Sequence, residues 1–177
     1  LGTIRLEGPL RKGKTSFHMA ARRTILDMLT SAFQRRAQTR QGLPLFINYN
    51  FDDFNLKLNH IFSPNSRLYF SSYWGNDRFV NQSFDGASPQ DKSAVPSKLT
   101  RLRWGNRVHA LRWTQLIGGR WFVQTILHHS QYQYAYNDLR LAPDLSGDSL
   151  KVVQFGNVTR SRLQDWGAKV MVDYYPT

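Results

Sequence analysis

Hydrophobic and polar residues alternate along two neighbouring stretches that together run from Tyr49 to Gly75. In the first stretch one side of a period-two strand carries Phe54, Leu56, Leu58 and Phe62, and the other carries Asp53, Asn55, Lys57 and Asn59. In the second stretch Leu68, Phe70 and Trp74 lie on one side, and Tyr69, Ser71, Tyr73 and Asp77 on the other. Ser63-Pro64-Asn65-Ser66 lies between the stretches and has the composition of a turn. The pattern predicts a hairpin with one apolar and one polar face.

Both stretches are long for strands of a water-soluble protein. Alternation by itself is common to soluble sheets and to membrane barrels. Each stretch has about ten or more residues, whereas a usual strand has about five or six and a tilted transmembrane strand needs about 9–11. The length therefore favours a hairpin that crosses a lipid bilayer.

The same period of two recurs along the rest of the chain. It predicts strands over residues 1–7, 16–22, 99–116, 120–136 and 166–174. Only residues 24–38 depart from it, because their apolar side chains have the spacing of a short helix inside a connection. The predicted fold is all-β, an antiparallel transmembrane β-barrel meander of about seven strands that forms part of a larger barrel.

The predicted connections alternate in length. Short ones fall at residues 8–14, 63–66 and 117–119, and long ones at 24–48, 76–98 and 137 to about 160. Outer-membrane barrels have short turns on the periplasmic rim and long loops on the extracellular rim, whereas a soluble sandwich has no reason to sort its loops in this way. This alternation is the strongest indication of a barrel in the sequence.

Aromatic residues are expected to form a girdle near each rim. Those near short turns are Phe17, Phe62, Trp113, Trp121 and Tyr174, and those toward long loops are Tyr49, Phe51, Trp74, Trp104, Tyr132 and Tyr134. The strand over residues 102–116 fits less well, because Arg103 and Arg107 share a face with Leu111 and Trp113. Either both arginines lie near the outer rim, beside lipopolysaccharide phosphates, or a bulge at Gly105 changes the phase.

The amino-acid composition limits the kinds of functional site and partner that the chain can have. The chain has 177 residues, no cysteine and a formal charge of +12, so thiolate sites are excluded and anionic partners are expected. No run of eighteen or more apolar residues occurs, so the sequence contains no candidate transmembrane helix. His128 and His129 point to opposite faces of a strand, which does not suit a metal site. No phosphate-binding or hydrolase motif is present, and we expect no catalytic residue, metal or cofactor.

The polar sides of the predicted strands form a candidate lumenal wall. Its members are Asp53, Asn55, Lys57, Asn59, Arg112, Lys169 and Asp173. Such a wall could dock a plug, guide a solute or only be hydrated, and plug docking is favoured. Asp53 is expected to pair with Lys57 or with an arginine of the plug.

Several short motifs occur in a characteristic order. They are Leu6-Glu7-Gly8-Pro9-Leu10, Arg22-Arg23-Thr24-Ile25-Leu26-Asp27, Arg67-Leu68-Tyr69-x-Ser71-x-Tyr73-x-Gly75-x-Asp77, and Trp104-Gly105-Asn106 with Leu111-Arg112-Trp113. Together they resemble the early barrel strands of TonB-dependent outer-membrane receptors, of the large nutrient-uptake type that carries a carboxypeptidase-regulatory-like domain. The resemblance implies a barrel of about 22 strands closed by an N-terminal plug, of which residues 1–177 supply roughly a third. The plug and N-terminal domains are absent from this sequence.

The function implied is energised uptake of a bulky nutrient, such as a glycan, peptide or chelate, across the outer membrane of a Gram-negative bacterium. The implied partners are membrane lipid and lipopolysaccharide, the receptor's own plug domain, the TonB complex acting through the missing N-terminus, and a possible surface lipoprotein. Nucleic acid is not among them. Two alternatives stay open: a soluble basic β-domain that binds nucleic acid, which predicts a dry core on the apolar face, and a small closed outer-membrane barrel acting as an enzyme or adhesin.

Overall fold

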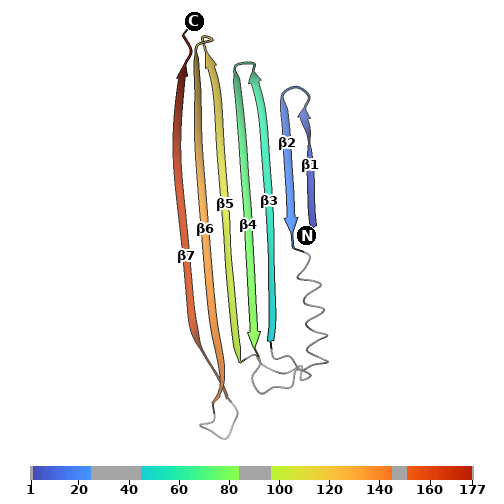
Figure 1. Ribbon diagram of the computed structural model, residues 1–177, viewed down its shortest axis with the longest axis vertical. Helices are drawn as coiled ribbons and strands as arrows, with labels where there is room; N and C mark the ends of the chain where they lie inside the picture. Colours follow the sequence, from blue (N-terminus) through green and yellow to red (C-terminus); the bar gives the residue numbers. More distant parts are fainter. Residues whose placement is uncertain (1, 25–44, 84–96, 145–150, 177) are drawn as a thin grey trace.

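The computed structural model describes residues 2–24, 45–83, 97–144 and 151–176 of the chain. These residues form seven strands: β1 (Gly2–Arg11), β2 (Thr15–Arg23), β3 (Leu45–Ser63), β4 (Ser66–Ser83), β5 (Lys98–Ile117), β6 (Trp121–Asp144) and β7 (Lys151–Tyr174). Each strand pairs antiparallel with the next, in the order β1-β2-β3-β4-β5-β6-β7 (Figure 1). The predicted antiparallel meander of seven strands is therefore confirmed.

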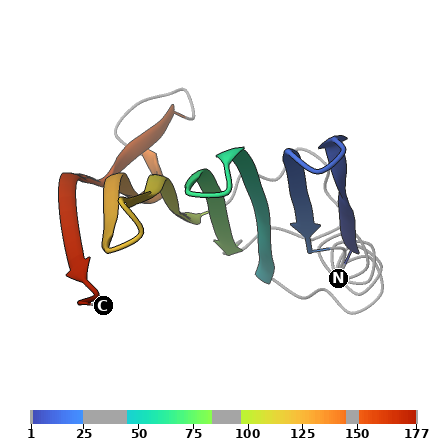
Figure 2. The same ribbon diagram turned by 90° about the horizontal axis from the view of Figure 1, so that it is seen from above.

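The sheet is a single open layer. Seen from above, the strands stand in one row from β1 to β7, and no second layer of described elements covers them (Figure 2). Among the described hydrophobic side chains only Leu99 is buried, at 9% exposure. The described residues contain no helix that is long and apolar enough to cross a membrane. The described part of the chain thus has no dry core on either face of the sheet.

Three tight turns lie at one end of the sheet, together with the C-terminus of the chain (Figure 1). They join β1 to β2 at residues 12–14, β3 to β4 at 64–65, and β5 to β6 at 118–120. Gly13, Gly118 and Gly119 have positive φ angles of 72°, 58° and 69°, which glycine adopts without steric cost. The three short connections were predicted from turn composition, and all three are present.

The strands are longer than predicted at their other ends. The predicted connection over 76–98 shrinks to residues 84–97, and the one over 137 to about 160 shrinks to residues 145–150. The first turn also shrinks, because β1 continues through Gly8 and Pro9 to Arg11; proline is tolerated there because the pairing of β1 with β2 is irregular between Pro9 and Arg11. Loop-like composition was misleading because pairing with a neighbouring strand overrides weak local preference. The predicted helix over 24–38 lies outside the described residues, apart from Thr24.

The two faces of the sheet follow from the register. Phe54 lies opposite Trp74, and Phe70 opposite Leu111, so these residues define the apolar face. Asp53 lies opposite Gly75 and belongs to the other, polar face. β5 pairs with β4 from Lys98 to Gln115 and with β6 from Lys98 to Ile117, in both cases without a register shift, so the bulge considered at Gly105 is absent.

Candidate functional site

All seven predicted lumenal residues lie on the polar face. Four of them alternate along β3, and one of these, Asn59, lies opposite Tyr69 of β4. Tyr69 in turn lies opposite Arg112 of β5, and Ile126 of β6 separates Arg112 from Lys169 of β7. Because directly opposite residues of antiparallel strands share a face, the register places the whole set on one side: Asp53, Asn55, Lys57, Asn59, Arg112, Lys169 and Asp173.

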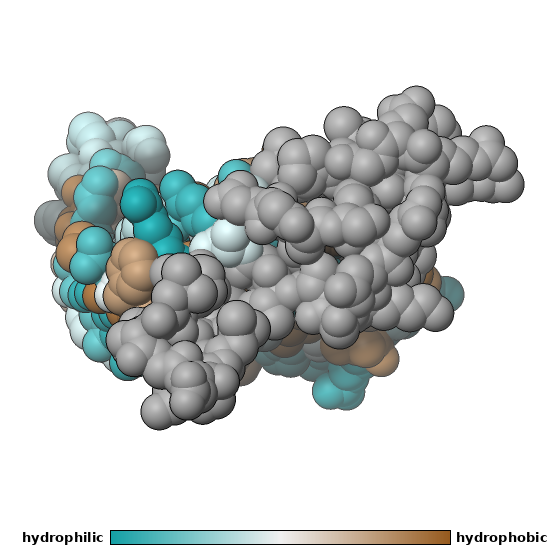
Figure 3. All heavy atoms as spheres, turned by 90° about the horizontal axis from the view of Figure 1, so that it is seen from below, coloured by the Kyte–Doolittle hydropathy of each residue, from teal (hydrophilic) through white to brown (hydrophobic). Residues whose placement is uncertain are grey.

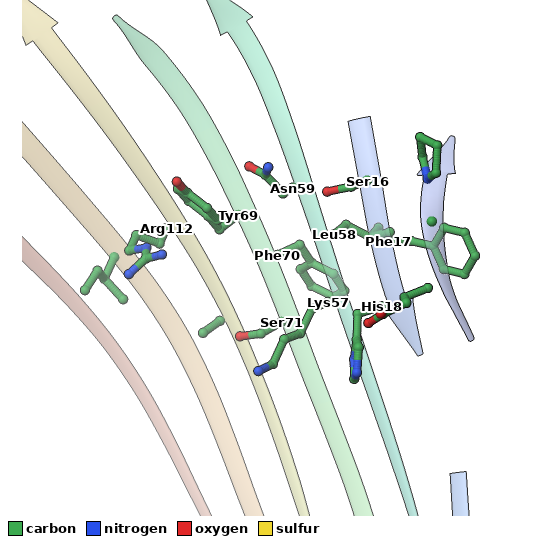
Figure 4. A pocket seen from close by; sticks show the side chains of 15 residues that line it. Ser16, Phe17, His18, Lys57, Leu58, Asn59, Tyr69, Phe70, Ser71 and Arg112 are labelled. Carbon is green, nitrogen blue, oxygen red and sulfur yellow. The ribbon is translucent and has the colours of Figure 1, made fainter. Parts of the chain in front are cut away.

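A hollow of about 860 Å³ opens on the polar face near the short turns (Figure 4). Lys57, Asn59 and Arg112 line it, whereas Asp53, Asn55, Lys169 and Asp173 do not. Tyr69 lies beneath the guanidinium of Arg112, whose Cζ is 4.2 Å from the ring centroid. This cation–π contact holds the positive charge of Arg112 at the hollow.

Two polar atoms at this hollow have no partner among the described residues. They are Nδ1 of His18 and Oδ1 of Asn59, both buried from solvent. A buried polar atom without a hydrogen bond is costly, by about 1–3 kcal/mol. A polar partner entering the hollow would satisfy both atoms. His18 was not singled out by its sequence, although its strand position already places it on this face.

Asp53 pairs with Arg22, and the predicted pairing with Lys57 is wrong. Oδ2 of Asp53 accepts hydrogen bonds from Nε of Arg22, at 2.8 Å, and from its Nη2. Oδ1 accepts the hydroxyl of Tyr73 at 3.0 Å. Lys57 lies four residues along the same strand, about 13 Å away, while Arg22 lies directly opposite Asp53 on β2. The cross-strand register decides the partner.

A second acidic contact lies further toward the long connections. The hydroxyl of Tyr49 donates to Oδ1 of Asp77 at 2.5 Å, and the Tyr49 ring stacks on Trp104 at 6.1 Å between centroids. Tyr49 lies five residues beyond Phe54, past the apolar part of β3. The hydrogen bond to Asp77, with smaller effects of burial and nearby negative charge, raises the pKa of Tyr49 to about 12. Aromatic and acidic groups therefore meet at this end of the polar face.

On the apolar face, five rings form a continuous row across five strands. Phe54 stacks on Trp74 at 5.1 Å, and Trp74 meets His109 edge-on at 5.6 Å. His109 stacks on His129 at 5.9 Å, and His129 contacts Trp166 at 4.1 Å. Nδ1 of His109 also lies 2.8 Å from the hydroxyl of Ser72, a residue only 4% exposed. We call Phe54, Trp74, His109, His129 and Trp166 the ring row.

A second set of aromatic residues lies on the same face near the short turns. The indole of Trp113 donates to Oγ of Ser66 at 3.0 Å, and the rings of Trp121 and Tyr174 are 4.5 Å apart. Between this set and the ring row the face is aliphatic, with Leu111, Leu127 and Val170. We call this stretch the apolar band.

The predicted outer girdle is partly wrong. Trp74 belongs to the ring row, but the register puts the other five members on the polar face: Tyr49, Phe51, Trp104, Tyr132 and Tyr134. The apolar face uses two histidines and Trp166 in their place. The prediction failed because it sorted aromatics by distance from a turn without applying the alternation of faces.

The apolar band is open to its surroundings. Leu127 is 49% exposed, Val170 62% and Trp166 76%. Seen from below, hydrophobic and hydrophilic residues lie side by side at the surface (Figure 3). Monomeric soluble proteins rarely leave a contiguous apolar surface of this kind uncovered.

No three His, Asp or Glu side chains of the described residues come together as a metal site. Comparison of the chain with protein-family models, curated proteins and solved structures finds no match.

Proposed function

We propose that the chain is part of the barrel wall of a TonB-dependent outer-membrane receptor that imports a bulky nutrient, such as a glycan, peptide or chelate. Its location would be the outer membrane of a Gram-negative bacterium. The chain would act as a wall and a docking surface rather than as an enzyme. The motif order in the sequence supports the family, and the two-faced sheet supports the location.

The observation that carries the proposal is the uncovered apolar band between two sets of aromatic residues. On β7 the band together with the two aromatic residues that flank it runs from Trp166 to Tyr174, which is nine residues and about 26 Å along the strand. Transmembrane strands need about 9–11 residues, and outer-membrane barrels carry an apolar band about 25 Å tall between aromatic girdles. Lipid would cover the side chains that no protein layer covers.

The polar face fits the inside of such a barrel. Its hollow offers the cation of Arg112 and the unsatisfied atoms of His18 and Asn59 to a polar surface. The receptor's own plug domain would supply that surface. Import would further require the TonB complex acting on the plug, and a surface lipoprotein could cover the long connections.

The open edges support a larger barrel. β1 and β7 each pair with only one other strand of the described sheet. Unpaired backbone groups cannot be left in the hydrocarbon of a membrane, where water is not available as a partner. Further strands of the full-length protein would pair with both edges and close the barrel.

The first experiment is membrane fractionation of the full-length protein, combined with gel mobility before and after boiling. Recovery in the outer membrane, with a mobility shift on boiling, is the result expected of a closed barrel. Recovery as a soluble protein without a shift would contradict the proposal. Nucleic-acid binding across a salt series would then be measured, because the charge of +12 favours that alternative.

The tryptophans allow a second test in reconstituted vesicles. Trp74, Trp113, Trp121 and Trp166 lie on the apolar face, and Trp104 lies on the polar face. Single-tryptophan variants of the full-length protein in brominated lipid should lose most of their fluorescence at the four apolar-face positions. Trp104 is the internal control and should be quenched little. Equal quenching at Trp104 and Trp113 would contradict the assignment of faces.

A further inference from the structure

Arginines gather on the apolar face from the level of the ring row, where Arg107 lies opposite Trp74, outward toward the long connections. They come from β4, β5 and β7, all are exposed, and we call them the arginine belt: Arg78, Arg101, Arg103, Arg107, Arg160 and Arg162. Arg107 lies two residues beyond His109, and Arg162 lies four beyond Trp166. These steps correspond to about 7 and 13 Å along the strands. The belt therefore borders the apolar band directly.

Positive charge in the belt is largely unmatched by the described residues. Arg78 and Arg103 lie directly opposite each other, an arrangement that like charges disfavour. The register places the acidic residues of the described strands on the polar face, with Asp52 as the exception. The Arg78 guanidinium is 3.9 Å from Asp52, and both side chains are nearly half exposed. A surface pair of that kind contributes little, so most of the charge of the belt is available to an external anion.

Four arginines of the belt surround a hollow of about 440 Å³. Arg103 and Arg160 lie on either side of Ala135, whose small side chain leaves room between them. Arg78 and Arg162 also line the hollow, beside Gln133. Asp77 is the one acidic residue in the lining, and its carboxylate accepts the hydroxyl of Tyr49 on the polar face. Guanidinium groups bind phosphate oxygens through paired hydrogen bonds, and several converging on one hollow suit a phosphate group.

The apolar band beside the belt indicates which class of anionic ligand would fit. A ligand that covers both surfaces must carry acyl chains and, immediately above them, phosphates. Nucleic acid offers phosphates but nothing for Leu127 or Val170. We propose that the arginine belt binds the phosphates of lipopolysaccharide while the band receives its acyl chains. This inference rests on the proposed function, because it requires the apolar band to lie in the outer membrane.

The test removes the four arginines of the hollow in the full-length protein, as R78Q, R103Q, R160Q and R162Q together. The control removes the same charge from exposed arginines outside the belt, as R5Q, R11Q, R67Q and R120Q. Both variants and the unaltered protein are taken from outer membranes in mild detergent. Bound lipid A, supplied with both phosphates or dephosphorylated, is then counted by native mass spectrometry.

We expect the belt variant to retain at least about tenfold less bisphosphorylated lipid A than the control, because each arginine near an anionic membrane surface adds to the attraction. Dephosphorylated lipid A should bind the unaltered protein and the belt variant equally weakly. Equal losses in both variants would overturn the inference in favour of non-specific charge attraction. Equal amounts of bisphosphorylated lipid A bound to the belt variant, the control and the unaltered protein would overturn it as well. If boiling still shifts the gel mobility of the unaltered protein, either outcome overturns only this inference and not the proposed function. If the unaltered protein shows no shift, the proposed function itself is refuted.

Binding of a DNA duplex by the unaltered protein, lost in the belt variant and kept in the control, would also overturn the inference. It would reassign the belt to nucleic acid. Phosphatidylglycerol vesicles provide the last comparison, because they carry one phosphate per lipid. If the unaltered protein retains more bisphosphorylated lipid A than phosphatidylglycerol, the result supports binding of lipopolysaccharide by the belt. Equal retention of the two lipids would overturn the inference, because the belt would then attract any anionic lipid.

Discussion

The polar and apolar faces of this sheet differ in how their side chains find partners. On the polar face the acidic groups near the long connections find partners in the chain itself: Asp53 binds Arg22 and Tyr73, and Tyr49 binds Asp77. Only at the hollow do His18 and Asn59 leave buried atoms without a partner among the described residues. On the apolar face the rings contact one another, but the aliphatic residues between them remain exposed. The comparison teaches that the polar face is organised by its own contacts, while the apolar face depends on what surrounds it.

The adjacent residues Ile126 and Leu127 test this difference most strongly, because both are aliphatic and they point to opposite faces. Leu127→Arg would place a charge in the middle of the apolar band and should lower the free energy of unfolding in vesicles by about 2–4 kcal/mol. Ile126→Arg should lower it much less, because the polar face is hydrated. The measurement is urea unfolding of the reconstituted full-length protein. Equal effects at the two positions would remove the distinction between the faces.

Arg22 and Arg23 provide the next test from the other face. Arg22→Gln removes the cation that donates twice to Oδ2 of Asp53, whose side chain is only 9% exposed. Because the Arg22 side chain is itself 50% exposed, the expected loss in the free energy of unfolding is modest, but it should exceed the loss for Arg23→Gln. Arg23→Gln, on the apolar face beyond the band, should change stability by less than about 0.5 kcal/mol. A larger loss for Arg23 would show that the apolar face also depends on internal ion pairs.

The smallest expected effect concerns Tyr49. Its pKa of about 12 in the folded chain exceeds the value of about 10 expected when unfolded. The stabilising hydrogen bond to Asp77 is therefore complete below pH about 10 and is lost as the pH rises toward about 12. The measurement is ultraviolet absorbance of tyrosinate, taken as the difference between the unaltered protein and Tyr49→Phe. Asp77→Asn should move this transition to lower pH, and an unmoved transition would remove Asp77 as the cause.

The alternation of faces was predictable because it is a local property of an extended chain. Leu56 and Leu58 share a face in any strand that contains them, whatever that strand pairs with. The same reasoning placed the seven polar residues together, and it could also have placed Trp104 and Tyr134 on the polar face. It could not tell which of the seven line the hollow, because that depends on the neighbouring strands.

Strand ends were harder to predict than strand interiors. Gly75 and Asn137 lie in sequence that looks like loop, yet both lie inside long paired strands. Ladder hydrogen bonds to a neighbour continue β4 and β6 past those residues, and a single strand's sequence contains no information on how long its neighbour is.

The sequence alone determined that this chain forms long two-faced strands joined by tight turns, because side-chain direction and turn chemistry depend on residues close in the chain. Only the tertiary structure decided that Arg22 meets Asp53 and that five rings from Phe54 to Trp166 form one row. It also decided that arginines from three strands surround one hollow. Each of these contacts depends on register, and register is set by the pairing of strands that are far apart in the sequence.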